Sequence, residues 1–181
     1  MNSDNMSLED ALKVSRDAYI ERQLRDVVIA STRGDTGLAA ARMFQGTGAN
    51  LIVVGHSVGF KEPNLNSFSL DARREIEALG GKVLQSTMPF HSINDAIRVK
   101  SGTSIETLIA DTLRMLGQGT KVCVEIVAMA CDNGLLESGR NVLAIAGTGK
   151  GADTVLVVRS ANSKRLFDIR VIEVIAKPEK I

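Results

Sequence analysis

Apolar and polar positions along this chain form two kinds of segment. Five short runs of mostly β-branched apolar residues predict buried strands. Longer segments with apolar residues three or four positions apart predict helices between them. The strands are expected at residues 26–30, 50–56, 82–86, 141–146 and 154–158, and the helices at 7–25, 35–46, 71–81, 105–119 and 121–136. The segment 167–178 mixes both periods, and no element is predicted for it.

Strands that alternate with helices predict an α/β fold, with a mostly parallel sheet covered by helices on both faces. The last predicted strand follows the fourth after a short loop without a helix, so it should run antiparallel. We expect residues 1–181 to form a single domain, with a helical extension over 1–25 and a C-terminal tail over 160–181 that packs on it. The longer crossover, 95–136, should hold two helices, and Ser7 should cap the first helix of the chain.

The amino-acid composition limits the kinds of partner that this protein is expected to bind. Lys and Arg number 22 against 21 Asp and Glu, and the net charge of +1 gives no sign of a nucleic-acid or anionic-membrane partner. Aromatic residues make up only 3%, which argues against base stacking. No apolar run reaches membrane-spanning length and the N-terminus is polar, so a cytoplasmic protein is expected. Cys123 and Cys131 lie about 12 Å apart on one predicted helix, too far for a disulfide, and should be core residues.

The stretch AIAGTGKGADTVLVV, residues 144–158, places three glycines beside Thr148 and Lys150 between two apolar runs. It lacks the Gly-Lys-Ser/Thr of a Walker loop and the G-x-G-x-x-G spacing of a dinucleotide loop. A strand follows it rather than a helix. One interpretation is a wide hairpin turn that uses glycine for positive φ. The other is one side of a ligand cradle.

The stretch STRGDT follows the first predicted strand and leads into a helix. The free amide groups and partial positive charge of a helix N-terminus attract phosphate. Ser31, Thr32 and Thr36 add hydroxyl donors, and Gly34 lets the backbone approach a ligand closely. The alternative is ordinary capping by Asp35, with the hydroxyls satisfying turn amides. Two such loops after parallel strands favour a ligand crevice beyond the C-terminal ends of the strands, and both loops should line it if the first and fourth strands are neighbours.

Four stretches together resemble a known family: VVIASTRGDT, LIVVGHSVGFKEPN, IADTLRMLGQGTKVCVEIVAMACDNGLL and AGTGKGADTVLVV. They are similar to the C-terminal domain of pyruvate kinase and, more closely, to the mainly archaeal and bacterial stand-alone proteins named after that domain. The resemblance implies a three-layer α/β/α fold with a mostly parallel five-stranded sheet of order 3-2-1-4-5, whose last strand is antiparallel. We also expect that the chain is not a pyruvate kinase, because the sequence contains no barrel domain.

In pyruvate kinase this domain binds a sugar-phosphate activator between the loop after the first strand and the late glycine-rich hairpin. The stand-alone relatives imply flavin mononucleotide (FMN) as the cofactor. Carried over to this chain, the resemblance assigns phosphate binding to Ser31, Thr32, Gly34 and Thr36 in the first loop and to Thr148, Gly149, Lys150 and Gly151 in the second.

Three further residues are candidate ligand contacts. His56 follows the second strand and should hydrogen-bond a ligand ring or ribityl hydroxyl, or else be satisfied by backbone groups. Phe60 should cover a ring face or else anchor its own loop. Glu125 lies in an apolar helix, where an unpaired carboxylate is costly. It should therefore pair with Lys121 or Arg114, or else accept hydrogen bonds from ligand hydroxyls.

Catalytic chemistry has little support in the sequence. His56 and His91 have no Cys, Asp or Glu partner at a metal-binding spacing, and no G-x-S-x-G elbow is present. A wall of Thr87, Met88 and His91 is a weaker expectation for the site. The leading hypothesis is a module that binds a small phosphorylated ligand, FMN. The alternatives are a flavin-dependent oxidoreductase of unknown substrate and a sugar-phosphate-sensing regulatory protein, and homo-oligomerisation is left open.

Overall fold

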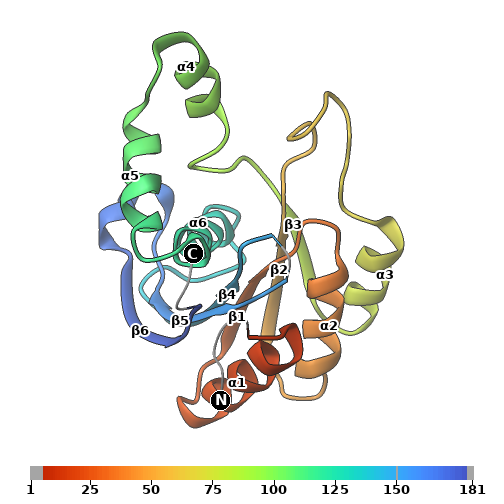
Figure 1. The fold of residues 1–181 in the computed structure, drawn as a ribbon. Coiled ribbons are helices and arrows are strands. Elements are labelled where there is room, and N and C mark those ends of the chain that lie inside the picture. The colour runs from red at the N-terminus through yellow and green to blue at the C-terminus, as the bar shows by residue number, and fades with distance from the viewer. Residues whose placement is uncertain (1–5, 150, 179–181) are drawn as a thin grey trace.

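The computed structural model describes residues 6–149 and 151–178 around a central six-stranded sheet (Figure 1). Its strands are β1 (Asp26–Ala30), β2 (Asn50–Gly55), β3 (Lys82–Gln85), β4 (Asn141–Ala146), β5 (Thr154–Arg159) and β6 (Arg170–Ala176). They lie in the order β3-β2-β1-β4-β5-β6. The first four in this order are parallel, β5 runs antiparallel to β4, and β6 runs antiparallel to β5.

The predicted order and the antiparallel direction of the fifth strand are confirmed, but the sheet has one strand more than predicted. β6 extends the sheet beyond β5, within the segment for which no element was predicted. Register shifts along the β5–β6 pair interrupt the two-residue alternation, and Ile172 and Val174 remain exposed. The apolar residues of this segment follow neither the strand period nor the helix period clearly, because this edge strand has no consistently buried face.

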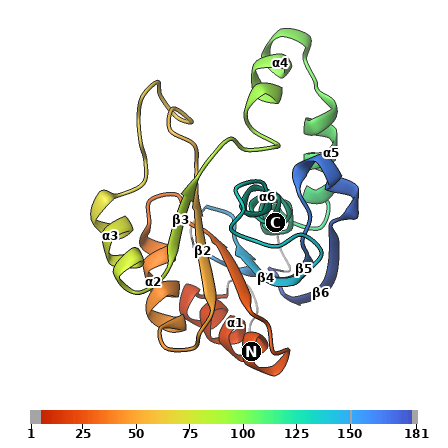
Figure 2. The same ribbon diagram turned by 180° about the vertical axis from the view of Figure 1, so that it is seen from behind.

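Helices cover both faces of the sheet and complete three layers (Figures 1 and 2). On one face lie α1 (Leu8–Glu21), α2 (Asp35–Phe44) and α3 (Leu70–Ala78). On the other face lies α6 (Gln118–Asp132), with α5 (Ile105–Arg114) packed on its outer side. A short 3-10 helix, η1 (Ser163–Asp168), also contacts α6. The α/β/α fold expected from the sequence is therefore confirmed.

Each face of the sheet has its own apolar core. Val27 and Ile29 of β1 pack toward α1 and α2, whereas Val28 between them packs toward α6. Successive side chains of a strand point to opposite faces, so a strand buried on both sides is apolar at every position. This explains why the β-strands of the sequence are continuous apolar runs.

The crossover between β3 and β4 holds three helices, not the two that were predicted. The additional helix is α4 (Ile93–Ser101), which buries only Asn94 and projects away from the sheet (Figures 1 and 2). Its apolar residues Ile93 and Val99 are 74% and 78% exposed. The prediction missed α4 because the helix has no apolar stripe facing a core.

Two local expectations agree with the structure. Ser7 caps α1, and its Oγ accepts the amide N–H of Asp10 at 3.1 Å. Cys123 and Cys131 are buried free thiols, and burial raises the pKa of both. Within residues 6–149 and 151–178, no helix combines the length and the apolar composition that a membrane crossing requires.

Candidate functional site

A cleft of about 720 Å³ opens at the C-terminal ends of the parallel strands. Ala30 ends β1, Val54 lies near the end of β2, and Gly147 follows β4, and all three line the cleft. Since β1 lies between β2 and β4, the loops that follow these strands meet at this edge of the sheet. Open α/β sheets commonly bind ligands in such a place, where the strand order reverses.

The loop between β1 and α2 contributes Ser31, Thr32 and Thr36 to the lining of the cleft. Ser31 is buried, and its Oγ accepts the amide N–H groups of Gly34 and Gly37, each at 3.1 Å. Ser31 therefore caps the beginning of α2 from within the loop. Its own O–H remains as a donor on the side of the cleft.

Gly34 is the one predicted residue of this loop that does not line the cleft. Its backbone has φ of 110°, and a Cβ at this position would lie 2.5 Å from Cβ of Ala72 in α3. Glycine is needed here because only it allows this conformation and this close helix contact. The structure thus places Gly34 in the packing between α2 and α3.

The amide groups of Asp35 and Thr36 begin α2 and have no acceptor within the described part of the chain. The alternative interpretation of this loop is wrong for Asp35, whose side chain does not cap the helix. It is right for one hydroxyl, because Ser31 Oγ satisfies the amides of Gly34 and Gly37. The Asp35 carboxylate is 79% exposed and lies 3.4 Å from Arg33 Nε. The N-terminus of α2 therefore presents free N–H groups to the cleft, with the charge of Asp35 partly balanced by Arg33.

The loop between β4 and β5 contributes Gly147, Thr148, Gly149 and Gly151, while Lys150 lies outside the described residues. A Cβ on Gly147 would lie 2.0 Å from the carbonyl oxygen of Gly151, so the two limbs of the hairpin approach closely. This loop joins strand to strand, as predicted.

Asp153 holds the β4–β5 loop in shape. Its Oδ2 accepts the hydroxyl of Thr148 at 3.0 Å, and its Oδ1 accepts that of Thr154 at 2.7 Å. Its amide donates to the carbonyl oxygen of Ala146 at 2.9 Å. The Asp-Thr pair therefore organises the turn, and the backbone of the glycines remains available on the cleft side.

His56 and Phe60 lie in the loop after β2, and both line the cleft. Their ring centroids are 4.2 Å apart, and the Phe60 ring also lies edge-on to His91 at 6.1 Å. His56 Nδ1 is the only buried side-chain nitrogen or oxygen without a partner among the described residues. The interpretation that backbone groups satisfy the ring is therefore wrong for Nδ1. Burial, together with the nearby His91, lowers the pKa of His56, so its ring is neutral at pH 7.

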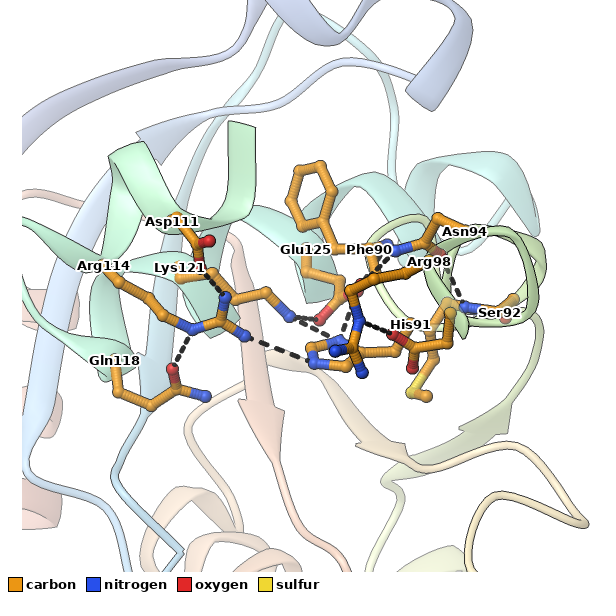
Figure 3. A network of polar contacts seen from close by, with 12 residues as sticks. Phe90, His91, Ser92, Asn94, Arg98, Asp111, Arg114, Gln118, Lys121 and Glu125 are labelled. Atoms are coloured by element: carbon orange, nitrogen blue, oxygen red, sulfur yellow. Dashed lines mark hydrogen bonds and ion pairs between the residues drawn. The ribbon is translucent and has the colours of Figure 1, made fainter. Parts of the chain in front are cut away.

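The far wall of the cleft is formed by α6 and the turn before α4 (Figure 3). Lys121 has no exposed surface, and its Nζ lies 2.5 Å from Glu125 Oε2 one turn later. Glu125 Oε1 also accepts the backbone N–H of Phe90 at 2.8 Å and lies 3.4 Å from His91 Nδ1. The predicted pairing of Glu125 with Lys121 is confirmed, and Glu125 lines the cleft as well.

Arg114 does not pair with Glu125, which was the other expectation for that residue. Its Nη1 donates to Asp111 Oδ1 at 2.6 Å, and its Nε donates to Gln118 Oε1 at 2.7 Å. Its Nη2 lies 3.3 Å from Nε2 of His91. Arg114 therefore connects the end of α5 to the beginning of α6 and to the turn that carries His91.

Burial acts on the two charges of the far wall in different ways. It lowers the pKa of Lys121, although the charge of Glu125 opposes this shift. It would raise the pKa of Glu125, but the charge of Lys121 and the hydrogen bonds from Lys121 and the Phe90 amide oppose it, so the pKa of Glu125 is lowered. The carboxylate is therefore ionised at neutral pH and holds the buried ammonium.

Gln118 and Lys121 line the cleft but were not among the predicted site residues. Together with Glu125 they recur at helical spacing on one face of α6 (Figure 3). A polar stripe on an otherwise apolar helix is the signal that could have identified them. Of the weaker candidates, Met88 and His91 line the cleft, whereas Thr87 does not.

Comparison with known proteins finds no family model that matches the chain. Solved structures similar to it include a Cryptosporidium parvum pyruvate kinase in complex with ADP, at 13% identity and a TM-score of 0.43, over 86% of this chain and 24% of that one. A second structure of a pyruvate kinase from this organism matches at 12% identity and a TM-score of 0.41. The match covers 86% of this chain and 23% of that one. An O-ureido-L-serine synthase matches at 22% identity and a TM-score of 0.33. This match covers 63% of this chain and 30% of that one.

The chain spans less than a third of the length of each of these proteins. At such identities and TM-scores, the matches carry no argument about ligand or activity.

Proposed function

We propose that the protein binds a small phosphorylated ligand, FMN, with the phosphate between the β1–α2 loop and the β4–β5 loop. The observation that carries this proposal is the pair of free amide groups of Asp35 and Thr36, which begin a helix at the edge of the cleft. Such groups, together with the helix dipole, favour a phosphate dianion. On this proposal the chain belongs with the stand-alone proteins named after the pyruvate kinase C-terminal domain.

Hydroxyl groups would complete the phosphate site. Thr32 and Thr36 line the cleft beside the free amides, and Thr148 lines it from the other loop. Lys150 is next to Gly149 in the sequence and adds a positive charge to the second loop. Hydrogen bonds to a charged phosphate are stronger than those between neutral groups, so they would supply most of the affinity.

The remainder of the cleft supports a ligand with a flat ring system. The volume of about 720 Å³ lies within the usual range for organic ligands of this size. Val54, Met88 and Val122 provide apolar surface, and the rings of His56 and Phe60 lie to one side. The flavin ring of FMN requires such a combination of apolar surface, aromatic contact and a few polar groups.

The first test is an absorption spectrum of the freshly purified protein, followed by heat release and identification of any chromophore. Titration calorimetry then compares FMN with riboflavin, which lacks the phosphate. We expect FMN to bind at least tenfold more tightly, because one charge-assisted contact is worth roughly this much. Equal affinity for FMN and riboflavin would contradict the phosphate site. Stabilisation by a sugar bisphosphate and not by FMN would contradict the flavin and favour the regulatory alternative.

A further inference from the structure

His91 lies between the cleft and a second cavity of about 270 Å³, and it lines both. Its Nδ1 is 2.7 Å from Lys121 Nζ. Because Lys121 is paired with Glu125 at 2.5 Å, it is an ammonium group, which can only donate hydrogen bonds. His91 Nδ1 must then be the acceptor, and the ring N–H is on Nε2.

This tautomer leaves the His91 Nε2–H group without an acceptor. Its polar neighbour is Arg114 Nη2 at 3.3 Å, and a guanidinium group carries only donors. The opposite tautomer would relieve this contact and would bring Nδ1–H within 3.4 Å of Glu125 Oε1. It would also set this N–H against the Lys121 ammonium at 2.7 Å, and the shorter distance favours Nδ1 as an acceptor. Lys121 and Arg114 therefore compete for one lone pair, and the cluster has more donors than acceptors.

Gln118 adds a third donor at the same place. Arg114 Nε can only donate, so the Gln118 atom that faces it at 2.7 Å is Oε1. The NH2 group of Gln118 is then left as a donor (Figure 3), and Gln118 lines the cleft. His91 Nε2, Arg114 Nη2 and this NH2 group have no acceptor in the ranges 6–149 and 151–178.

We propose that His91, Arg114 and Gln118 form a second subsite at the border between the cleft, which His91 and Gln118 line, and the smaller cavity, which His91 and Arg114 line. This subsite binds a carbonyl or carboxylate oxygen of the ligand. This inference rests on the proposed function, in which the phosphate of that ligand lies at the two loops. These donors are only partly buried, so water can pair with them in the free protein, and a ligand oxygen would take the place of that water. Asp111 balances the charge of Arg114, so a neutral carbonyl suits the subsite as well as a carboxylate does.

Lys121 and Glu125 are positioning residues in this arrangement. Lys121 is fully buried behind His91 and determines which ring nitrogen carries the proton. Glu125 keeps Lys121 ionised and holds the Phe90 backbone next to His91. The ligand would meet His91, Arg114 and Gln118, whose side chains are only partly buried.

Matched pairs of ligands test the subsite separately from the phosphate site. FMN carries ring carbonyls, and ribitol 5-phosphate is the same molecule without the ring. 6-Phosphogluconate ends in a carboxylate, and sorbitol 6-phosphate has a hydroxyl in its place at equal chain length. The first pair probes a carbonyl source and the second a carboxylate source, with the phosphate present in all four compounds.

Two variants of Gln118 remove the donor in different ways. Gln118→Met removes it without a change of charge, and Gln118→Glu retains the acceptor for Arg114 Nε while it replaces the donor by an oxygen. We expect either variant to lose roughly tenfold in affinity for the member of a pair that carries the acceptor oxygen, with the other member unaffected. Lys61→Met removes a charge from an exposed residue of the same cleft and should affect both members equally.

The outcomes separate the two proposals. If Gln118 variants bind both members of each pair as the parent does, the subsite is wrong and the phosphate site stands. If FMN and riboflavin bind equally but Gln118→Met still weakens both, the phosphate site is wrong and the subsite stands. If none of the compounds binds the parent protein, both are wrong.

Nitrogen NMR of the imidazole rings provides a second, independent measurement on the free protein. The chain has two histidines, so a spectrum of His91→Gln assigns the remaining signals. We expect His91 to be the Nε2–H tautomer and its Nε2 signal to shift when FMN or 6-phosphogluconate is added. An Nδ1–H tautomer in the free protein would overturn the argument for the subsite.

Discussion

The two ends of the cleft present different kinds of chemical group. The loop end consists of backbone amides, hydroxyl groups and glycines, and its charged side chains, Arg33 and Asp35, are exposed. The α6 end consists of ionised side chains that are buried or half-buried, with Lys121 and Glu125 paired at 2.5 Å. At the loop end, Ser31 caps α2, but the side chains of Thr32 and Thr36 line the cleft without a hydrogen bond to another described residue. At the α6 end, the residues that shape the cleft also stabilise the protein.

The largest effect on stability is expected at the α6 end. Glu125→Leu would leave the Lys121 ammonium buried without its partner and the Phe90 amide without its acceptor. Removing one member of a buried pair costs about 3–5 kcal/mol. Urea denaturation followed by circular dichroism measures this change. As a control, Glu9→Gln breaks the exposed pair with Lys13 and should leave the midpoint unchanged. Equal effects of the two substitutions would contradict the assigned role of burial.

The next largest effect is expected at the loop end, from its backbone. Gly34→Ala introduces a Cβ 2.5 Å from that of Ala72 and forces a backbone conformation that alanine rarely adopts. We expect a loss of about 1–3 kcal/mol in the free energy of unfolding. Gly46→Ala is the matched control, because Gly46 also has positive φ but has no atom within 4 Å of the added Cβ. A larger loss for Gly46→Ala than for Gly34→Ala would contradict this account of the helix contact.

Side chains of the loop end should affect the ligand and not the fold. Thr36→Val and Lys150→Ala each remove one donor or charge from the proposed phosphate site. We expect the dissociation constant for FMN to rise roughly tenfold while the free energy of unfolding changes by less than about 0.5 kcal/mol. Calorimetry and urea denaturation measure the two quantities, and riboflavin binding serves as the control. If both variants bind FMN as the parent does, the two-loop site is wrong.

The smallest expected effect is the pH dependence of stability that comes from His56, a further residue of the cleft. Burial lowers the pKa of His56 in the folded protein below its usual value of about 6.5. The unfolded chain therefore takes up this proton first as the pH falls. Stability from the neutral ring is fully present above about pH 6.5 and is lost as the pH falls through the folded pKa. An NMR titration should give a midpoint below about 6.5 for His56, and a midpoint at or above that value would contradict the assignment.

Much of the fold follows from local patterns in the sequence. The β1 and β4 runs are apolar at nearly every position, and this is the pattern of strands buried on both faces. Glycines and capping residues such as Ser7 mark where helices begin and end. The elements that escaped prediction, α4 and β6, have few buried residues. Local patterns report burial, so an element with little burial leaves no clear pattern.

The sequence by itself determined the alternation of strands and helices, the antiparallel fifth strand and the position of both glycine-rich loops along the chain. These features depend on residues close to one another in sequence. Only the tertiary structure decided which groups meet in the cleft and at its border with the second cavity. His91, Arg114 and Gln118 come from separate elements, and their donor surplus exists only because packing brings them to one place. The role of Ser31 as the cap of α2, in place of Asp35, likewise depends on the path of the backbone, which the residue types alone do not specify.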